Sequence, residues 1–290
     1  MSLYQILTRG WTGPISEEIR AKALSRLEQG DVLVLPELGI AVDADEGGVF
    51  DPGILASAKN ASFDPASERL SGTTLDGEAA APLVGLMRRF SDGSASLVAA
   101  LLPRYARQLV RARASFRPAE IAGRPTSWRK DDTRLHVDSF PATPSGGRRI
   151  LRVFTNVNPN GRPRVWRVGD AFESVASHFA AELRVPPPGA GQLLAWLRIT
   201  KSRRTPYDAL MLQLHDRMKA DTAFQSTTPQ TEVPFAAGST WLAFTDQVSH
   251  AAMSGQYQLE QTFLLPIAAM QEPERSPLRV LERLKGRALT

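Results

Sequence analysis

Residues 127–158 read SWRKDDTRLHVDSFPATPSGGRRILRVFTNVN and hold the most informative pattern in the chain. A candidate strand at 134–138 is followed by a Pro-Ser-Gly-Gly turn and a β-rich run at 149–158. His136 and Asp138 are two residues apart on the candidate strand, so their side chains point to the same face. An imidazole and a carboxylate placed together supply two ligands of the 2-His-1-carboxylate iron site found in non-haem Fe(II) oxygenases. Such a pair also arises by chance, so the rest of the chain decides whether it forms a site.

The segments on either side of this stretch set the fold class. After it come two helical runs and then three β-type runs, at 170–184, 206–220, 233–235, 238–244 and 257–266. Before it, the spacing of apolar residues predicts a helix at 14–29, a buried strand at 31–38, an irregular region at 60–80 and a helical pattern at 81–115 with a break at Ser-Asp-Gly. Helices, then strands with a helical insert, then strands again favour an α+β fold.

We therefore predict a single domain over 1–290, built on a double-stranded β-helix (jelly-roll, cupin-like) core. The predicted parts are an N-terminal helical and strand region at 1–115, the core at 116–267, a helical insert at about 170–220 and a basic amphipathic tail at 272–290.

Composition restricts the chemistry. The chain has 290 residues, 42% of them hydrophobic, and no cysteine. Disulfides, thiolate nucleophiles and Cys-ligated zinc are excluded, so a metal site must use histidine and carboxylate. The net charge of +5, carried mostly by arginine, suits anionic partners because guanidinium groups bind carboxylates and phosphates. No nucleic-acid-binding motif is present, and neither a signal peptide nor a membrane span is predicted, so we expect a cytoplasmic protein.

A third metal ligand is available at His250, which follows the Gly-started run 238–244. It lies 112 residues after Asp138 (250 minus 138), far enough to cross a β-structure with an insert. His178 and His215 lie in amphipathic helical runs, where packing or surface roles are the rule, so they are poorer candidates.

These motifs together resemble the Kdo hydroxylases, a family within the Fe(II)/2-oxoglutarate-dependent dioxygenases. The resemblance rests on SWRKDDTRLHVDSFP, GRRILRVFTNVNP, RVWRVGDAF and GSTWLAFTDQVSHAA, and it covers most of 116–267. It implies hydroxylation of the 3-position of 3-deoxy-D-manno-oct-2-ulosonic acid (Kdo) in the lipopolysaccharide inner core (Kdo-lipid A), giving the Ko sugar. It also implies His136, Asp138 and His250 as catalytic iron ligands, with 2-oxoglutarate and dioxygen as co-substrates and ascorbate as an additive in vitro.

The residue that anchors 2-oxoglutarate is not obvious. Many dioxygenases place an arginine about ten residues after the distal histidine, but residues 256–263 contain no basic side chain. On the β-rich run, Arg152 and Asn156 share the face opposite the apolar one and are predicted to contact the co-substrate. Arg148, Arg149 and Arg162 are alternatives, each of which could equally be a loop residue in contact with solvent.

Cationic and aromatic residues near the metal pair are candidates for contact with an acidic sugar. They are Trp128, Lys130, Arg134, Arg148 and Arg162, and a second cluster places Arg164 and Arg167 around Trp166. The alternative for Trp128 is simple packing.

The tail could bind an anionic membrane peripherally, as basic amphipathic helices do, or dock on the domain as a terminal helix. Two other functions remain open at this point: a different cupin-type metal-dependent enzyme, and a non-catalytic module that binds anionic ligands or lipid.

Overall fold

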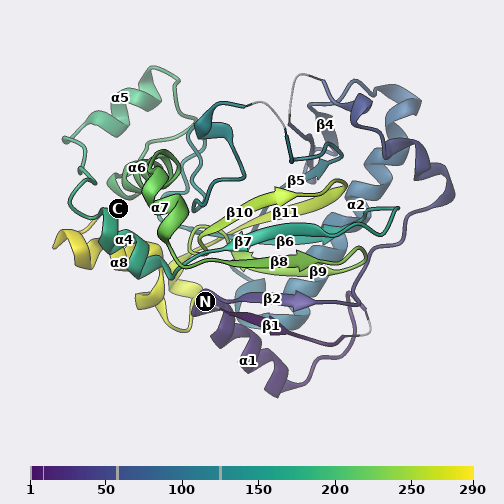
Figure 1. Ribbon diagram of the computed structural model, residues 1–290, viewed down its shortest axis with the longest axis horizontal. Helices are drawn as coiled ribbons and strands as arrows, with labels where there is room; N and C mark the ends of the chain where they lie inside the picture. Colours follow the sequence, from purple (N-terminus) through teal and green to yellow (C-terminus); the bar gives the residue numbers. More distant parts are fainter. Residues whose placement is uncertain (1, 9, 57–58, 124–125) are drawn as a thin grey trace.

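The fold is built from two β-sheets that face each other. The computed structural model describes residues 2–8, 10–56, 59–123 and 126–290 (Figure 1). The larger sheet has eight strands in the order β1-β2-β9-β6-β11-β5-β3-β4, and the smaller has three in the order β10-β7-β8. The strands are β1 (Leu3–Gln5), β2 (Val32–Leu35), β3 (Ala61–Asp64), β4 (Arg69–Ser71), β5 (Val110–Arg117), β6 (Arg149–Asn156), β7 (Arg164–Val168), β8 (Thr231–Phe235), β9 (Thr240–Phe244), β10 (His250–Ser254) and β11 (Gln258–Leu265).

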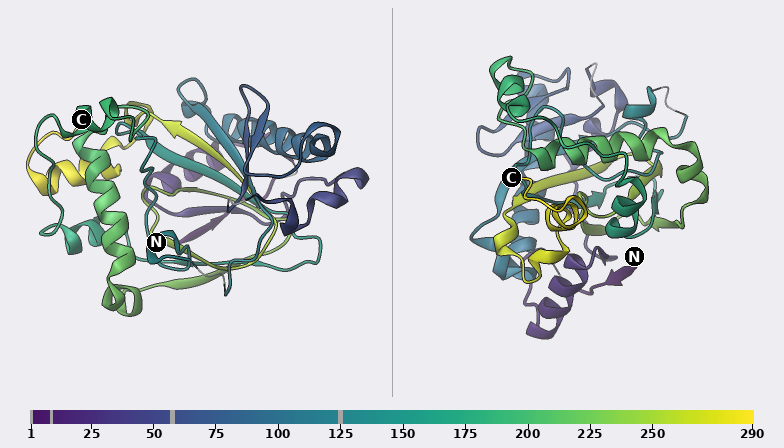
Figure 2. Two further views of the ribbon diagram at one scale, coloured as in Figure 1. Left: turned by 90° about the horizontal axis from the view of Figure 1, so that it is seen from above. Right: turned by 90° about the vertical axis from the view of Figure 1, so that its left-hand side faces the viewer.

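Helices cover the outer face of the larger sheet and one end of the molecule. They are α1 (Glu17–Glu28), α2 (Gly77–Leu101), α3 (Pro103–Ala106), α4 (Phe172–Phe179), α5 (Ala190–Trp196), α6 (Pro206–Ala220), α7 (Thr222–Thr227) and α8 (Pro277–Lys285). Figure 2 shows α4 to α8 gathered at one end of the strands. None of the helices in the described ranges is long and apolar enough to cross a membrane.

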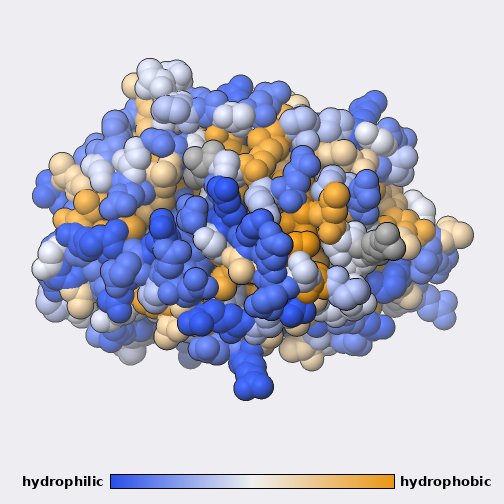
Figure 3. Space-filling view, turned by 90° about the horizontal axis from the view of Figure 1, so that it is seen from below, coloured by the Kyte–Doolittle hydropathy of each residue, from blue (hydrophilic) through white to orange (hydrophobic). Residues whose placement is uncertain are grey.

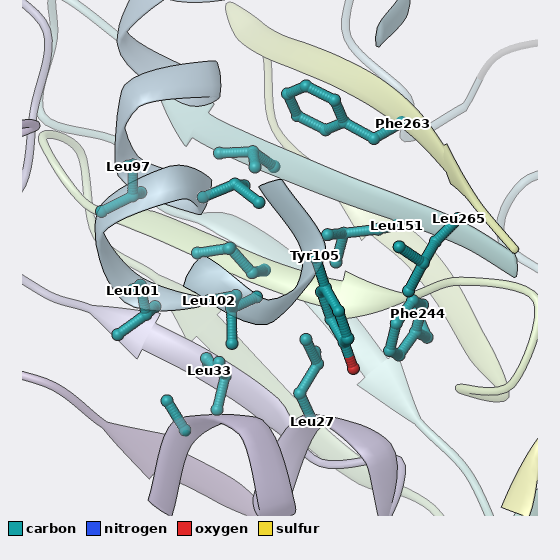
Figure 4. Close-up of a cluster of buried hydrophobic side chains, with 14 of the residues drawn as sticks. Leu27, Leu33, Leu97, Leu101, Leu102, Tyr105, Leu151, Phe244, Phe263 and Leu265 are labelled. Atoms are coloured by element: carbon teal, nitrogen blue, oxygen red, sulfur yellow. The ribbon is translucent and has the colours of Figure 1, made fainter. Parts of the chain in front are cut away.

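Alternation along the central strand β6 explains why it separates two environments. Leu151 and Val153 point outward and pack with leucines of α1 and α2, in the cluster shown in Figure 4. Phe154 points inward and packs with Trp166 of the smaller sheet and Trp241 of β9. Because successive side chains on a strand face opposite sides, the same strand seals the outer core and lines the space between the sheets.

The sequence prediction for 81–115 is wrong in two respects. Helix α2 runs through the Ser-Asp-Gly sequence without a break, because Gly93 lies against Trp11 and a Cβ there would be only 3.1 Å from its ring. The end of the predicted helix is strand β5, which pairs with β11 and β3. Residues 60–80 are also not irregular throughout, since they contain β3, β4 and the start of α2.

The predicted strand at 134–138 is only a single bridge, between His136 and His250. Conversely, His250 opens a strand, β10, although it lies outside the β-type runs predicted at 238–244 and 257–266. The tail forms the docked helix α8, whose residues Leu278, Val280 and Leu281 are buried against α4 and α6 residues. This arrangement favours the docked alternative for the tail, because its apolar side chains are not available to a membrane.

Candidate metal centre

Two imidazoles and one carboxylate meet between the sheets. His136 and His250 are joined by reciprocal backbone hydrogen bonds of 2.9 Å, which place their rings side by side with centroids 4.6 Å apart. Asp138 is fixed by its backbone amide, which donates to Thr245 O at 2.8 Å. The ligand atoms of the three residues lie within 4.8 Å of one another, so they could hold one metal ion.

Backbone carbonyls set the orientation of both imidazoles. Nδ1 of His136 lies 2.8 Å from Arg134 O, and Nδ1 of His250 lies 2.8 Å from Val248 O. A carbonyl oxygen only accepts, so Nδ1 of each ring carries the proton and Nε2 keeps its lone pair. This is the tautomer in which Nε2 can bind a metal, held by a partner outside the ligand set.

The electrostatics favour two neutral imidazoles and one ionised carboxylate. Burial lowers the pKa of His136 well below its usual value and also lowers that of His250. Burial opposes the charge on Asp138, but the neighbouring Arg152 guanidinium outweighs it and holds the pKa of this carboxyl well below the usual range. The donor set is therefore ready for a divalent cation without first losing protons.

A cavity of about 200 Å³ opens directly beside the triad. Arg117 and Arg152 enter it from the larger sheet and share Glu260, with N–O distances of 3.1 and 2.9 Å. Arg164 enters from the smaller sheet. The formal charges that line the cavity cancel. Three arginines face three carboxylates, namely Arg117, Arg152 and Arg164 with Asp132, Asp138 and Glu260.

Several polar atoms around this cavity are buried without a hydrogen-bond partner. Within the described ranges they are Nε of Arg117, Arg152 and Arg164, Nε1 of Trp166, Oδ2 of Asp138 and Oε1 of Gln258. Nε of Arg152 is 3.3 Å from the Asp138 carboxylate, but the two groups are not aligned as a hydrogen bond. Buried donors normally have partners, so the four unpaired donors indicate a place for an anionic ligand.

Arg164 adds electrostatic support for an anion. Burial lowers its pKa to about 9, and the neighbouring Arg117 guanidinium contributes to the shift. The residue stays protonated at neutral pH, but its charge is poorly compensated, because no carboxylate in the described part of the chain lies within 4.0 Å of it. A bound carboxylate would restore both its hydrogen bonds and its solvation.

A second, outer cleft of about 500 Å³ continues from this cavity toward the surface. The two share Arg117, Phe140, Arg152 and Glu260, so they lie side by side with these residues between them. The outer part adds further cationic side chains from β5 and from the loop after α5, which are Arg111, Arg113 and Lys201. A large anionic ligand could therefore lie in the outer cleft and reach the triad.

The structure brings together some of the predicted residues and not others. His136, Asp138, His250 and Arg152 line the cavity, as does Arg164 of the second cluster. Asn156 does not, because its side chain donates to Arg162 O and Phe235 O and accepts from the Asn158 amide. It holds a turn, so it is not retained in the candidate site.

The predicted sugar contacts Trp128, Lys130, Arg134, Arg148 and Arg162 lie outside the cavity lining. Trp128 stacks with Arg129, whose guanidinium lies 4.0 Å from the ring. Arg134 donates to Lys219 O, and Arg148 to Ser145 O. The prediction placed them by closeness in sequence to the metal pair, but the chain turns away on both sides of it.

The other candidates for the anion anchor and for the metal ligands also lie outside the cavity. Arg149 points to the opposite face of β6 and pairs with the buried Asp246, so it is not an anchor for a ligand. His178 packs on Phe179 and Phe224. His215 lies edge-on to His136 with centroids 5.4 Å apart but is not a member of the metal-binding group.

Sequence reasoning missed Arg117, Glu260 and Gln258. Arg117 ends a run, Ala112 to Arg117, in which small or apolar residues alternate with polar ones. That period-2 pattern signals a strand with one polar face, and it was read as the end of a helix.

Residues 10–288 match the sequence model of a family described as 3-deoxy-D-manno-oct-2-ulosonic acid (Kdo) hydroxylase. The comparison with curated protein sequences finds no match.

Solved structures of the Kdo hydroxylase KdoO, a non-haem Fe(II) alpha-ketoglutarate-dependent dioxygenase, are similar to this chain. The complex with alpha-ketoglutarate and Fe(III) is 44% identical, with a TM-score of 0.96 over 100% of this chain and 98% of that one. The complex with cobalt(II) is 46% identical, with a TM-score of 0.96 over 99% and 97%. The apo structure is 45% identical, with a TM-score of 0.97 over 100% and 97%.

Proposed function

This chain belongs to the Kdo hydroxylase family, and from that premise we propose that it hydroxylates the 3-position of Kdo on Kdo-lipid A, giving the Ko sugar. It is an Fe(II)/2-oxoglutarate-dependent dioxygenase. The observation that supports the residue assignments is the buried cavity in which three metal-binding side chains face four unpaired donors.

The triad fits the metal. His136 and His250 would bind through Nε2, since each Nδ1 is engaged by a carbonyl, and Asp138 would bind through its carboxylate. The unpaired Oδ2 of Asp138 is a buried acceptor that a cation would satisfy. Two imidazoles and one carboxylate are a ligand set typical of non-haem Fe(II).

The donors beside the triad fit 2-oxoglutarate. We assign its carboxylates to Arg117, Arg152, Arg164 and Trp166, whose buried Nε and Nε1 atoms lack partners. The charges agree with this assignment, because the lining is formally neutral and the addition of a divalent cation and a dianion keeps it neutral. Arginines can also bind a carboxylate through two parallel hydrogen bonds, which fixes its orientation.

When bound, iron and 2-oxoglutarate supply the oxidation: one oxygen atom of dioxygen enters a C–H bond as a hydroxyl, and 2-oxoglutarate yields succinate and carbon dioxide. The protein positions the reactants and shields them from water. Arg117, Arg152 and Glu260 form a rigid charged wall, and Trp166 stacks on His250 with ring centroids 5.0 Å apart. No side chain is needed as a general base, because the metal carries the chemistry.

The acceptor would occupy the outer cleft. Kdo is an acidic sugar, and the cleft is lined by Arg111, Arg113 and Lys201 and adjoins the cavity of the triad at Arg152. A lipid-linked acceptor requires the enzyme to work at a membrane surface, so we propose peripheral membrane contact.

We also propose that the two facing sheets form a double-stranded β-helix within a single domain. The shared core of Phe154, Trp166, Phe235 and Trp241 supports this arrangement, since it joins residues of both sheets. The pairing of the N-terminal strand β2 with β9 supports a single domain.

The decisive experiment is mass spectrometry of Kdo-lipid A incubated with the protein, Fe(II), 2-oxoglutarate and ascorbate. The expected result is the gain of one oxygen on a Kdo residue, matched by succinate formation and abolished in His136→Ala. Anaerobic addition of 2-oxoglutarate to the Fe(II) protein should produce a charge-transfer absorption. If succinate forms with oxygen uptake but Kdo-lipid A is unmodified, the acceptor is wrong. If no absorption forms, the dioxygenase assignment itself fails.

A further inference from the structure

The loop that carries α5 exposes an unusual group of apolar side chains. Leu193, Trp196, Leu197 and Ile199 are 54%, 79%, 50% and 57% exposed, within seven consecutive residues. Large apolar residues are usually buried, and an exposed tryptophan next to three aliphatic residues forms a patch of the kind that marks an interaction site. The segment projects from the upper part of the molecule in Figure 1 and stands away from the body in the right-hand view of Figure 2.

This segment is built into the fold. A Cβ at Gly191 would lie 1.9 Å from the Arg204 carbonyl oxygen, so only glycine allows the two ends of the loop to meet. The Lys201 amide donates to Ala142 O at 2.9 Å, and the Arg204 guanidinium donates to Pro141 O at 2.6 Å. The exposed side chains are therefore held on a closed loop that is tied to the chain just after the metal-site residue Asp138.

The charge of the segment has one sign. Residues 184–204 contain five basic side chains, Arg184, Arg198, Lys201, Arg203 and Arg204, and no acidic one. Their net charge of +5 equals that of the whole chain. The face on the other side of the molecule, seen from below, is covered mostly by hydrophilic residues (Figure 3).

We propose that residues 190–204 dock the protein on an anionic lipid surface, with Trp196, Leu193, Leu197 and Ile199 entering the interface and the basic residues meeting the headgroup phosphates. This rests on the proposed function, whose acceptor is lipid-linked, and it identifies the surface involved. Tryptophan is favoured at the level of the headgroups, and basic residues near the surface add to the attraction.

The charge of the loop favours an anionic bilayer over a second copy of the chain as its partner. Two copies joined through residues 190–204 would bring two groups of four positive charges together, and like charges face to face oppose association. An anionic bilayer complements both the apolar and the basic part of the loop.

The docking also sets the orientation of the active site. Lys201 belongs to the loop and lines the outer cleft together with Phe140 and Arg152. The membrane surface would thus lie at the mouth of the cleft, where an acidic sugar on a lipid anchor enters. The tail is a poorer candidate for this contact, because Leu278, Val280 and Leu281 of α8 are buried.

The test is cosedimentation with vesicles of phosphatidylcholine alone and of phosphatidylcholine mixed with phosphatidylglycerol. The wild-type protein should bind the mixed vesicles, and the double variant Trp196→Ser/Leu197→Ser should bind about tenfold less or weaker still, since it loses the inserted side chains. Leu7→Ser is the matched control, because Leu7 is 71% exposed and follows β1 at the lower edge of Figure 1. A second variant, Arg198→Gln/Arg203→Gln, should weaken binding and reduce its dependence on salt.

Absence of binding by the wild-type protein would overturn the proposal, as would an equal loss in Leu7→Ser. A dimer that disappears in the Trp196 variant would assign the patch to a second copy instead. Folding is checked by the unfolding midpoint, which should not change at these exposed positions. Hydroxylation of a delipidated, water-soluble Kdo acceptor should be unchanged in both loop variants, while hydroxylation of vesicle-embedded Kdo-lipid A should fall. If even the wild-type protein modifies neither acceptor, the proposed function fails while the docking result stands separately.

Discussion

Arg164 shows how a single side chain can be costly for folding and useful for binding. Its guanidinium is buried at the edge of the cavity, donates to the Gly255 carbonyl and leaves Nε unpaired. A buried cation without an acidic partner does not favour the folded state, whereas an incoming carboxylate would be bound strongly by it. Stability and co-substrate binding should therefore respond in different ways to its removal.

We predict that Arg164→Gln raises the KM for 2-oxoglutarate by about tenfold to a hundredfold, since a charge-assisted hydrogen bond contributes about 1.5–3 kcal/mol. Iron affinity should be retained, and the unfolding midpoint should stay the same or rise. Arg167→Gln is the control, because Arg167 lies on the opposite face of the same strand, β7. Steady-state kinetics and thermal unfolding check both. An unchanged KM in Arg164→Gln would contradict the assignment.

Arg149 illustrates the opposite case, a buried charge with a partner. It donates to both carboxylate oxygens of Asp246, at 2.8 and 3.3 Å, and both residues are almost completely buried. We predict that Arg149→Met lowers the free energy of unfolding by about 3–5 kcal/mol at neutral pH, because it strands a buried carboxylate. Arg148→Met, which alters a half-buried neighbour, should cost only about 0.5 kcal/mol.

The loss of unfolding free energy caused by Arg149→Met should be smaller at mildly acidic pH than at neutral pH. Burial raises the pKa of Asp246, although Arg149 opposes the shift, so the folded state holds this proton more tightly than the unfolded state does. A raised pKa contributes stability at low pH that is lost as the pH rises through the folded-state value. Without Arg149 the pKa of Asp246 rises further, so the free energy of unfolding depends more strongly on pH in the variant than in the wild-type protein. Urea unfolding at two pH values measures it, and an equal or larger loss at acidic pH would contradict the argument.

The candidate metal ligands were predictable from sequence, while the residues proposed to bind the anion were only partly so. His136 and Asp138 are close in sequence, and His250 was the only other histidine outside the helical runs. Arg117 and Arg164 could not be assigned in the same way, because their meeting in one cavity depends on how two sheets face each other. Sequence spacing carries no information about that distance.

At the level of elements, the tail shows that an amphipathic sequence pattern does not determine what a helix packs against. Helix α8 has the alternation of a membrane-surface helix, yet its apolar face packs on α4 and α6 residues. We predict that Leu281→Ala lowers the free energy of unfolding by about 2–5 kcal/mol, as expected for a fully buried leucine. Leu284→Ala, at a position that is 37% exposed, should cost far less. Chemical denaturation measures both. Equal small losses would mean that the helix is not docked in solution.

Elements with local signals were predicted well. Ser16 caps α1, and Thr205, Pro206 and Asp208 form the start of α6 with a capping box, so these helices match the sequence prediction closely. Strand β5 was missed because its pairing partners β11 and β3 are distant in sequence and override the preceding helical pattern. Helix α5 was missed because its apolar residues face solvent and so have no periodic core signal.

At the scale of the molecule, the candidate site connects the two sheets. His250, Arg164 and Trp166 come from the smaller sheet, and Arg152 and Arg117 come from the larger one. In the described part of the chain, unpaired donors from both sheets belong to side chains that line this one cavity, namely Arg117 and Arg152 from the larger sheet and Arg164 and Trp166 from the smaller. A ligand that satisfies them adds contacts across the gap that only the folded state can make, so its binding energy adds to the stability of the fold.

We therefore predict that cobalt(II) and 2-oxoglutarate together raise the unfolding midpoint by roughly 9 °C when each is at about a hundred times its dissociation constant, since each ligand at that level adds about 2.7 kcal/mol. Cobalt alone should give a smaller rise, and 2-oxoglutarate without metal very little, because the triad must first be neutralised by a cation. Differential scanning calorimetry with and without a chelator measures each contribution. In Arg164→Gln the shift caused by cobalt should persist while the increment from 2-oxoglutarate disappears. A full 2-oxoglutarate increment in that variant, or a large one in His136→Ala, would place the anion site away from the surface where the two sheets meet.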